Sequence, residues 1–546
     1  MKIAIAQINT IVADIEGNKN KIISFIKQAE NSGADLVVFP ELSTIGYPPM
    51  DLLERNKLID DNIESFEYIK KFSADIKCAV LLGFISRNSD NPPMLYNSAA
   101  LIHKGDIILK QNKLMPCRLD GVCTIHTPKG LSSPTLDGVC TIHTPKELSL
   151  PTAEFMGIKI GIVIGGDISI DLINQGADVI INVSASSYFL SFREERMSVL
   201  QQIALANSVN IIFANHVGGN DSLIFDGNSF FVNRKGGIYA HGKSFAEDLV
   251  IADIDSQDKI DVIIDSMEDL MKALVTGLRD YMFKSGFSKC LLGLSGGIDS
   301  ALVAAIACEA VGAENVFSIT MPSPFSSSGS VDDSYKLAKN LGMNIDTIPI
   351  KNLYEQFLNE LAPLLADNIK SITEENLQAR IRGILLMAVS NNSGALLLST
   401  GNRSECATGY ATMYGDMCGG LAVISDISKT LVYKLSEYIN SKAGKDIIPR
   451  EIIDKEPSAE LRPNKRDQDS LPPYDILDAI LELYIDQNMS AIEIEMKGFN
   501  RDIIDSVLHM VNINTYKRFQ AAPGLKVTSR SFGTDRRIPI VKKFKP

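Results

Sequence analysis

A glycine-rich turn between an apolar strand and an apolar helix most constrains the fold of this chain. The turn is GLSGGIDS, residues 293–300, and it connects the short apolar run KCLLGL to the longer run ALVAAIACEAVG. A second strand-like run, NVFSITMP, follows that helix. Strand, tight turn, helix and strand together form a parallel βαβ unit with a right-handed crossover, so the sequence predicts an α/β domain with a doubly wound parallel sheet.

The same turn has the composition of an anion site. Gly296 and Gly297 allow the backbone to approach an oxyanion closely, and the amino end of the following helix favours negative charge. No Gly-Lys-Ser/Thr follows, which excludes a Walker loop, and Asp299 is instead a candidate Mg²⁺ ligand. We therefore expect the turn to hold the pyrophosphate part of a nucleotide.

The length of the chain requires more than one core. A single hydrophobic core stops growing near roughly 250 to 300 residues, whereas this chain has 546. Apolar runs such as KIAIAQI, ADLVVFPEL and IKIGIVIGG alternate with amphipathic stretches up to residue 255. The segment 256–270 is rich in charge and lacks a strand pattern, so the boundary is predicted there. We expect one domain over residues 1–255 and a second over 265–546.

Charge and cysteine usage exclude several classes of protein. The net charge of −12 argues against a protein that holds a nucleic-acid backbone, which needs clustered Lys and Arg. The eight cysteines include no CxxC pair, so neither a zinc site nor a disulfide framework is indicated. A signal peptide and an uninterrupted apolar run of about 18 residues are both absent from the sequence. We expect a cytoplasmic protein with no membrane partner.

One short segment is present twice in tandem. LDGVCTIHTPK begins at Leu119 and again at Leu136. Repeat architectures need three or more units to bury a core, and only two are present. His126 and His143 lack further metal ligands at suitable spacing. We expect residues 119–152 to form a flexible surface insertion without chemistry of its own.

Several motifs in the second half resemble one enzyme family. SGGIDS, at Ser295–Ser300, is the hallmark of the ATP-pyrophosphatase superfamily. The resemblance extends from Leu274 to Ile540 and is to the synthetase domain of glutamine-dependent NAD synthetases. It is carried by ITEENLQARIRGILLMAVSN, LLSTGNRSECATGYATMYGDMCGG, PSAELRPNKRDQDSLPPYDILDAIL and YKRFQAAPGLKVTSRSFGTDRRIPI.

This resemblance implies an ATP-dependent ligase that converts deamido-NAD to NAD. AMP would first be transferred from ATP to the nicotinate carboxylate, and ammonia would then displace it. By motif, Asn376, Glu405 and Lys517 would bind deamido-NAD, while Asp299 and Glu405 would hold Mg²⁺. Lys429 is a further candidate for phosphate binding, and the family implies a homo-oligomer. The residues that would bind ATP are Gly293, Leu294, Ser295, Gly296, Gly297, Ile298, Asp299, Ser300 and Thr400.

The first half resembles the carbon-nitrogen hydrolase, or nitrilase, family from Lys2 to about Val232. The resemblance is carried by FPELSTIGYPP, DVIINVSASSYFLSFREER and NHVGGNDSLIFDGNSFFVN. It implies a four-layer αββα sandwich in which a Glu, a Lys and a Cys release ammonia from glutamine. The thiolate would attack the amide, the Glu would move the proton and the Lys would stabilise the oxyanion. Glu41 is the expected glutamate.

The expected cysteine is missing from its motif. Where the family has a block similar to GVLICEDIW, this chain reads GIVIGGDIS, so Gly165 stands in the place of the nucleophile. Lys113 is the best match for the catalytic lysine, and Lys110 is the next best match. Ser186 remains as part of the glutamine-binding motif, whereas Phe192 stands where a substrate-binding lysine is expected.

Three hypotheses follow from these departures. The first, which they favour, is an NAD synthetase that uses free ammonia. The second retains glutamine use through another thiol, such as Cys117, Cys123 or Cys140, although each lies outside the motif. The third is a non-catalytic assembly protein. The complete ATP and deamido-NAD motifs argue against the third hypothesis, because a chain without catalytic function should have accumulated substitutions in the motifs of both halves.

Overall fold

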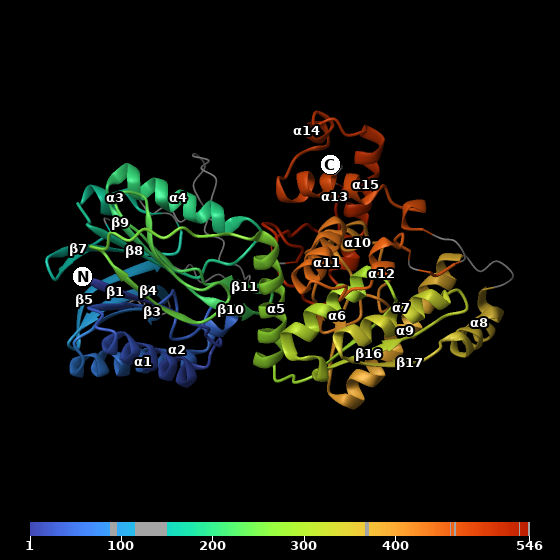
Figure 1. Cartoon of the computed structure of the whole chain (residues 1–546), viewed down its shortest axis with the longest axis horizontal. Coiled ribbons are helices and arrows are strands. Elements are labelled where there is room, and N and C mark those ends of the chain that lie inside the picture. Colours follow the sequence, from blue (N-terminus) through green and yellow to red (C-terminus); the bar gives the residue numbers. More distant parts are fainter. Residues whose placement is uncertain are drawn as a thin grey trace. The chain divides into compact units, whose positions relative to one another are not determined.

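The computed structural model divides into two units, Met1–Asp269 and Leu270–Pro546, both drawn in Figure 1. The charge-rich residues 256–264 belong to the first unit, where Val262 and Ile264 pack against its core. Almost all of the predicted insertion 119–152, with Cys117, lies outside the described residues. The structure describes residues 1–87, 95–114, 150–166, 168–365, 371–458, 460–462, 466–533 and 535–543.

In its described part, the first unit contains two six-stranded sheets and four α-helices. The helices are α1 (Ile15–Asn31), α2 (Asn56–Phe72), α3 (Ile170–Asn174) and α4 (Phe192–Asn207). One sheet is formed by β1 (Lys2–Gln7), β2 (Leu36–Val38), β3 (Ala79–Arg87), β4 (Leu95–His103), β5 (Asp106–Leu114) and β14 (Asp248–Asp253). The other is formed by β6 (Thr152–Phe155), β7 (Ile158–Ile164), β8 (Val179–Ser184), β9 (Asn210–Asn215), β12 (Phe230–Val232) and β13 (Ile238–His241). A separate hairpin joins β10 (Val217–Asn220) to β11 (Leu223–Asp226).

These elements form four layers, in the order helices, sheet, sheet, helices (Figure 1). The strand order is β14-β1-β2-β3-β4-β5 in one sheet and β13-β12-β9-β8-β7-β6 in the other. In β1, Ile3 and Ile5 face the core between the sheets, while Ala4 and Ala6 face the core beneath α1 and α2. Both faces of the strand are apolar because both are covered. The predicted αββα sandwich is confirmed.

The second unit is built on a five-stranded, fully parallel sheet. Its strand order is β17-β16-β15-β18-β19. The strands are β15 (Cys290–Gly293), β16 (Val316–Thr320), β17 (Asn344–Thr347), β18 (Leu396–Ser399) and β19 (Leu421–Ala422). The helices are α5 (Ser266–Lys284), α6 (Ile298–Val311), α7 (Ser328–Leu341), α8 (Lys351–Leu365), α9 (Ser371–Ser393), α10 (Arg403–Thr408), α11 (Lys429–Ala443), α12 (Arg450–Asp454), α13 (Tyr474–Leu481), α14 (Ala491–Glu495), α15 (Arg501–Ile513) and α16 (Thr515–Arg518).

The strand order places a topological switch point beside β15. The chain moves outward from β15 through β16 to β17, and then returns to the other side of β15 as β18. On one face, Leu291 and Ile319 pack with Tyr354 of α8 and Ile381 of α9. Parallel sheets of this kind bind ligands outside the carboxyl ends of the strands at the switch point. The predicted doubly wound sheet is confirmed, and β15 and β18 mark where its site should lie.

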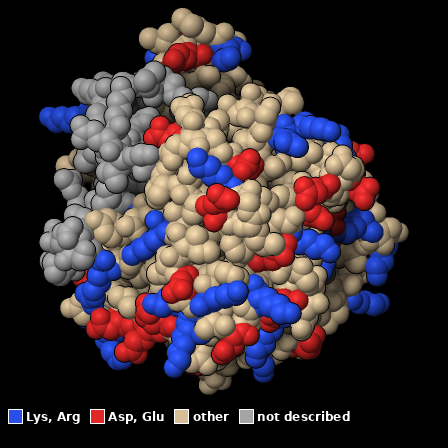
Figure 2. Space-filling model, turned by 90° about the vertical axis from the view of Figure 1, so that its left-hand side faces the viewer, with Lys and Arg blue, Asp and Glu red and all other residues tan. Residues whose placement is uncertain are grey.

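The surface charge is of mixed sign on the face drawn in Figure 2. Acidic and basic side chains are interspersed there rather than gathered by sign. Ion pairs also occur on the surface of the first unit, as between Arg87 and Asp60 at 2.7 Å. None of the helices in the described part of the chain combines the length and hydropathy needed to cross a bilayer.

Candidate active sites

The glycine-rich turn follows β15 directly and leads into α6. Gly296 has a φ of +75°, and a Cβ on it would lie only 2.3 Å from the carbonyl oxygen of Ser330. Only glycine combines that conformation with that contact. The Ser300 hydroxyl donates to the Gly297 carbonyl at 3.0 Å and accepts from the Ser295 N–H at 3.3 Å. These two bonds hold the turn in shape at the amino end of α6.

Two carboxylates meet at the end of this turn around one buried ammonium. Lys429 Nζ contacts Asp299 and lies 3.6 Å from Glu405 Oε1, and its side chain is 4% exposed. Asn402 Nδ2 donates to Asp299 Oδ1 at 2.9 Å. The structure therefore brings together Asp299, which follows β15, and Glu405, which follows β18, as expected of a switch point.

Burial and charge shift the ionisation of this cluster. Burial, reinforced by Asp299, raises the pKa of Glu405 above its ordinary value. Burial opposes the charged form of Lys429, but Asp299 and Glu405 outweigh that effect and raise the pKa of Lys429. The lysine therefore stays positively charged at the end of the turn.

The predicted deamido-NAD residues Asn376 and Lys517 converge on one segment, residues 409–412. Thr412 Oγ1 donates to Asn376 Oδ1 at 2.8 Å. Lys517 Nζ donates to the carbonyls of Gly409 at 2.7 Å and Ala411 at 2.9 Å. An ammonium has three donors, so Lys517 can offer a further hydrogen bond to a ligand. Thr400, predicted to bind ATP, is the first residue after β18.

Sequence reasoning missed the part that Asn402 plays in this site. Its side chain accepts from the Glu405 N–H at 3.0 Å, and the Glu405 carboxylate accepts from the Asn402 N–H at 3.3 Å. This capping box begins α10 and fixes the position of Glu405. The spacing Asn-x-x-Glu in GNRSE is a helix-start signal that could have identified it.

In the first unit, Glu41 and Lys113 form a salt bridge of 3.2 Å. The Glu41 side chain is 4% exposed and also accepts from Asn97 Nδ2. His216 Nε2 lies 2.5 Å from the Glu41 carbonyl oxygen. Lys110, the alternative lysine, instead lies over the Phe84 ring, 5.6 Å from its centre. The geometry therefore pairs Lys113 with Glu41.

Gly165 lies directly against this pair. It follows β7, and its N–H donates to the Val183 carbonyl of β8 at 2.8 Å. A Cβ on Gly165 would lie 2.9 Å from Lys113 Nζ and 3.0 Å from Glu41 Oε2. A side chain at this position would therefore point between the carboxylate and the ammonium. The φ of Gly165 is +57°, a conformation that glycine adopts without strain.

The two remaining positions of the glutamine-binding motif are both buried. The Ser186 N–H donates to Asn215 Oδ1 at 2.8 Å. Phe192 is 1% exposed and stacks on Phe189, with ring centres 4.2 Å apart. The Arg196 guanidinium lies 5.4 Å from the Phe192 ring centre. Phe192 is thus a packed aromatic residue without a polar group to offer a substrate.

Comparison with known proteins agrees with this division into two enzymatic units. A sequence profile of the carbon-nitrogen hydrolases matches residues 2–262, and a profile of the NAD synthases matches residues 270–521. The glutamine-dependent NAD(+) synthetase of Thermotoga maritima is 39% identical, with 100% of this chain and 99% of the relative covered. That of Synechocystis sp. is 41% identical, with 100% and 99% covered.

Solved structures agree as well. The glutamine-dependent NAD+ synthetase of Acinetobacter baumannii, in complex with ADP, is 37% identical. The match has a TM-score of 0.75 and covers 99% of this chain and 98% of that one. The fold and these comparisons thus define a ligase of NAD biosynthesis that carries a carbon-nitrogen hydrolase unit. The chain belongs to the family of glutamine-dependent NAD(+) synthetases.

Proposed function

We propose that this chain amidates deamido-NAD to NAD with ATP and free ammonia, and that it does not release ammonia from glutamine. The observation that carries the proposal is Gly165, which lies against Glu41 and Lys113 without a side chain. Thioester formation requires a thiolate between the base and the oxyanion-stabilising lysine, and glycine has no atom that could serve. Phe192 further removes a polar contact expected for glutamine.

The described thiols offer no replacement. Within the described part of the first unit, Cys78 is the one cysteine. It is 1% exposed, and burial raises the pKa of its thiol to about 12. A thiol that stays protonated and inaccessible cannot act as a nucleophile at neutral pH. Three further cysteines lie outside the described residues: Cys117, Cys123 and Cys140. Glutamate release by the full chain would reveal a nucleophile among them.

The second unit would form the acyl-adenylate. A carboxylate is a poor electrophile, and transfer of AMP from ATP gives it a good leaving group that ammonia can displace. The turn 293–300 would hold the departing pyrophosphate through its backbone N–H groups, with Lys429 as the adjacent cation. Asn376 and Lys517 would bind deamido-NAD. The ADP bound by the relative from Acinetobacter baumannii supports an adenine nucleotide in this family. We further expect a homo-oligomer.

The residues at the end of the turn fit a magnesium ion. Mg²⁺ in nucleotide sites usually takes one or two carboxylates together with substrate phosphates. Asp299 and Glu405 supply two carboxylates that already share one cation, Lys429. Among the described residues, no group of three or more His, Cys, Asp or Glu side chains gathers as a metal site. Phosphate oxygens of the substrate would supply further ligands, as they usually do for Mg²⁺ in nucleotide sites. A bound Mg²⁺ would neutralise charge on the leaving pyrophosphate.

The purified chain should form NAD from deamido-NAD, ATP and ammonium, but produce almost no NAD when glutamine replaces ammonium. Glutamate release should stay near background, because no thioester can form. The measurement is a paired assay of NAD and glutamate by chromatography, with deamido-NAD and ATP present throughout. Stoichiometric glutamate and NAD in ammonium-free buffer would overturn the proposal, and mass spectrometry of a trapped thioester would then identify the thiol.

Restoring the thiol alone should give little recovery of glutamine use. In Gly165→Cys, the new Cβ would lie 2.9 Å from Lys113 Nζ and 3.0 Å from Glu41 Oε2, which is closer than ordinary contact, so these side chains must shift. The residue would also take a left-handed conformation that costs about 1–2 kcal/mol. Phe192 also remains in place. We expect glutamate release below about a tenth of the ammonium-dependent rate. Gly176→Cys, also at positive φ but with open space around its Cβ, is the matched control for strain and for non-specific thiol chemistry. Rapid glutamine turnover by Gly165→Cys would show that the pocket is otherwise intact.

A further inference from the structure

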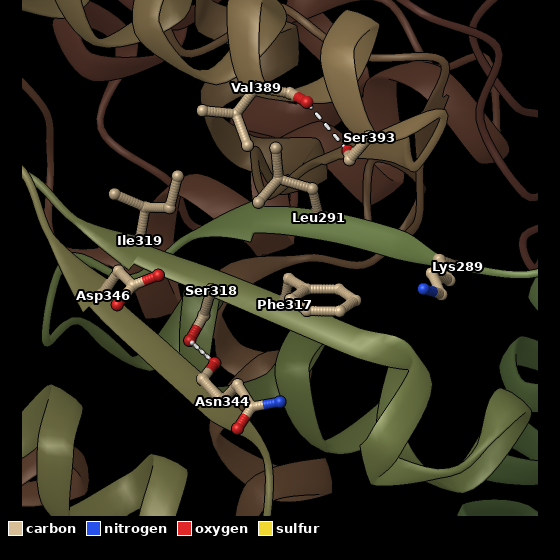
Figure 3. A pocket seen from close by; sticks show the side chains of 9 residues that line it. All are labelled: Lys289, Leu291, Phe317, Ser318, Ile319, Asn344, Asp346, Val389 and Ser393. Carbon is tan, nitrogen blue, oxygen red and sulfur yellow. Dashed lines mark hydrogen bonds between the residues drawn. The ribbon is translucent and has the colours of Figure 1, made fainter.

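A surface cavity shows how α9 lies across the parallel sheet (Figure 3). The cavity has a volume of about 100 Å³ and none of the predicted site residues line it. Lys289 precedes β15 and Phe317 lies near the start of β16, so the cavity marks the amino ends of the strands. In Figure 3, Val389 and Ser393 of α9 lie on the side of the sheet to which Leu291 points. The end of α9 therefore lies over the amino ends of the strands, and its earlier turns lie toward their carboxyl ends.

The path of α9 brings Arg382 beside Gly293, the first residue of the glycine-rich turn. A Cβ on Gly293 would lie 3.2 Å from Leu386 Cδ1 and 3.4 Å from Met321 Cε. One helical turn before Leu386, Arg382 Nε donates to the Met321 carbonyl at 3.0 Å. Met321 directly follows β16. The Arg382 guanidinium is therefore at the carboxyl ends of β15 and β16, beside the start of the predicted ATP loop.

Few internal partners satisfy this guanidinium. Among the residues that the structure describes, the bond from its Nε to the Met321 carbonyl is its one hydrogen bond, and none of their carboxylates lies in salt-bridge distance of it. Burial lowers the pKa of Arg382 to about 10, with partial compensation by Glu460 and Asp416. A partly buried guanidinium whose terminal nitrogens lack such an ion pair carries a desolvation cost that an anionic ligand would offset.

Arg518 shows what a structural arginine in the same unit looks like. Burial lowers its pKa to about 10 as well. Its terminal nitrogens, however, donate to the carbonyls of Ala407 at 2.8 Å and Cys406 at 3.3 Å, and to Val511 and Thr515. Arg518 therefore fastens backbone segments together, whereas Arg382 is also largely buried but has a single bond within the described part of the chain. The difference points to a ligand as the missing partner of Arg382.

We propose that Arg382 binds a phosphate group of ATP at the start of the turn, while Asp299 and Lys429 act at its end. This inference rests on the proposed ATP site. Arginine suits the role because its planar fork can donate two parallel hydrogen bonds to a phosphate. The diphosphate of deamido-NAD offers the same chemistry. ATP is favoured because Arg382 is bonded to Met321 beside Gly293, whereas Asn376 and Lys517 converge on residues 409–412.

The test measures ADP binding and steady-state kinetics in the full chain. In Arg382→Gln, we expect the Kd of ADP and the KM of ATP to rise about tenfold or more, with the KM of deamido-NAD changed less than about twofold. Arg382→Lys should recover part of the affinity, because it keeps the charge but loses the fork. Arg518→Gln is the matched control: its melting temperature should fall, while its Kd for ADP stays near the wild-type value.

Three other results would contradict the assignment of Arg382 to a phosphate of ATP. A rise in the KM of deamido-NAD alone would assign the phosphate to the second substrate. Unchanged constants for both substrates would make Arg382 a structural residue. If Arg382→Gln fails to fold, Arg382→Lys must still weaken ADP binding, and unchanged binding in that variant overturns the proposal. Calorimetric binding of ADP needs no amide donor, so failure of ammonia use in the wild-type chain would not imitate any of these results.

Discussion

Asp299→Ala is expected to reduce NAD formation with ammonium by about 100-fold or more, while the chain remains folded. Asp299 contacts Lys429 and accepts from Asn402 at 2.9 Å. Its loss removes a candidate magnesium ligand and leaves the buried Lys429 with Glu405 as its remaining close carboxylate. The pyrophosphate formed in the adenylation step would then lack part of its charge compensation. Initial rates of NAD formation at saturating ATP and ammonium measure the effect.

Glu309→Ala is the matched control for this prediction, because Glu309 lies on the same helix, α6, and is exposed. It should keep the wild-type rate. Both variants should show the circular dichroism spectrum of the wild-type chain. A folded Asp299→Ala protein with near-normal turnover would refute the assignment of Asp299 as a magnesium ligand.

Asp426→Ala should produce the largest loss of stability, about 3–5 kcal/mol, because it leaves buried donors without their acceptor. Asp426 is 3% exposed and accepts from the backbone N–H groups of Val527 at 2.9 Å and Thr528 at 2.8 Å. Arg403 Nε lies 3.6 Å away. The carboxylate therefore fastens the C-terminal segment to the loop before α11 and the start of α10.

Calorimetry should show the midpoint of the second unit falling by on the order of 10 °C in Asp426→Ala. Asp505→Ala is the control, since Asp505 forms an exposed pair with Arg501 at 3.0 Å. Exposed pairs contribute about 0–1 kcal/mol, so its midpoint should hardly change. Equal midpoints for the two variants would show that the contacts of Asp426 are not what holds the C-terminal segment.

Local sequence patterns predicted the fold well because both units repeat strongly periodic strands and helices. Strands covered on both faces read as continuous apolar runs, as in KIAIAQI, and the turn at 293–300 marks one strand end unambiguously. The charge-rich segment 256–264 is less informative. Val262 and Ile264 pack against the first unit, and their burial depends on which surface the chain meets after β14.

The candidate sites were less predictable, because they depend on contacts between distant residues. Lys429 was a minor candidate from sequence, yet it lies between Asp299 and Glu405 once β15 and β18 are neighbours. Arg382 lies within the motif ITEENLQARIRGILLMAVSN, but the sequence assigned it no role, since an arginine on a helix is usually a solvated side chain. Its significance comes from the single bond to Met321 beside the turn.

Under the proposed ammonia dependence, the conformation of Gly165 also constrains how substitutions could introduce glutamine use. A cysteine acquired first would be strained at a φ of +57° and would crowd Lys113, with Phe192 still excluding a polar contact. A lysine acquired first at position 192 would place a charge in a packed aromatic layer, with no nucleophile to benefit from it. Under the proposed ammonia dependence, neither substitution alone is therefore expected to give glutamine use, and a gain of that activity would require at least two coordinated changes.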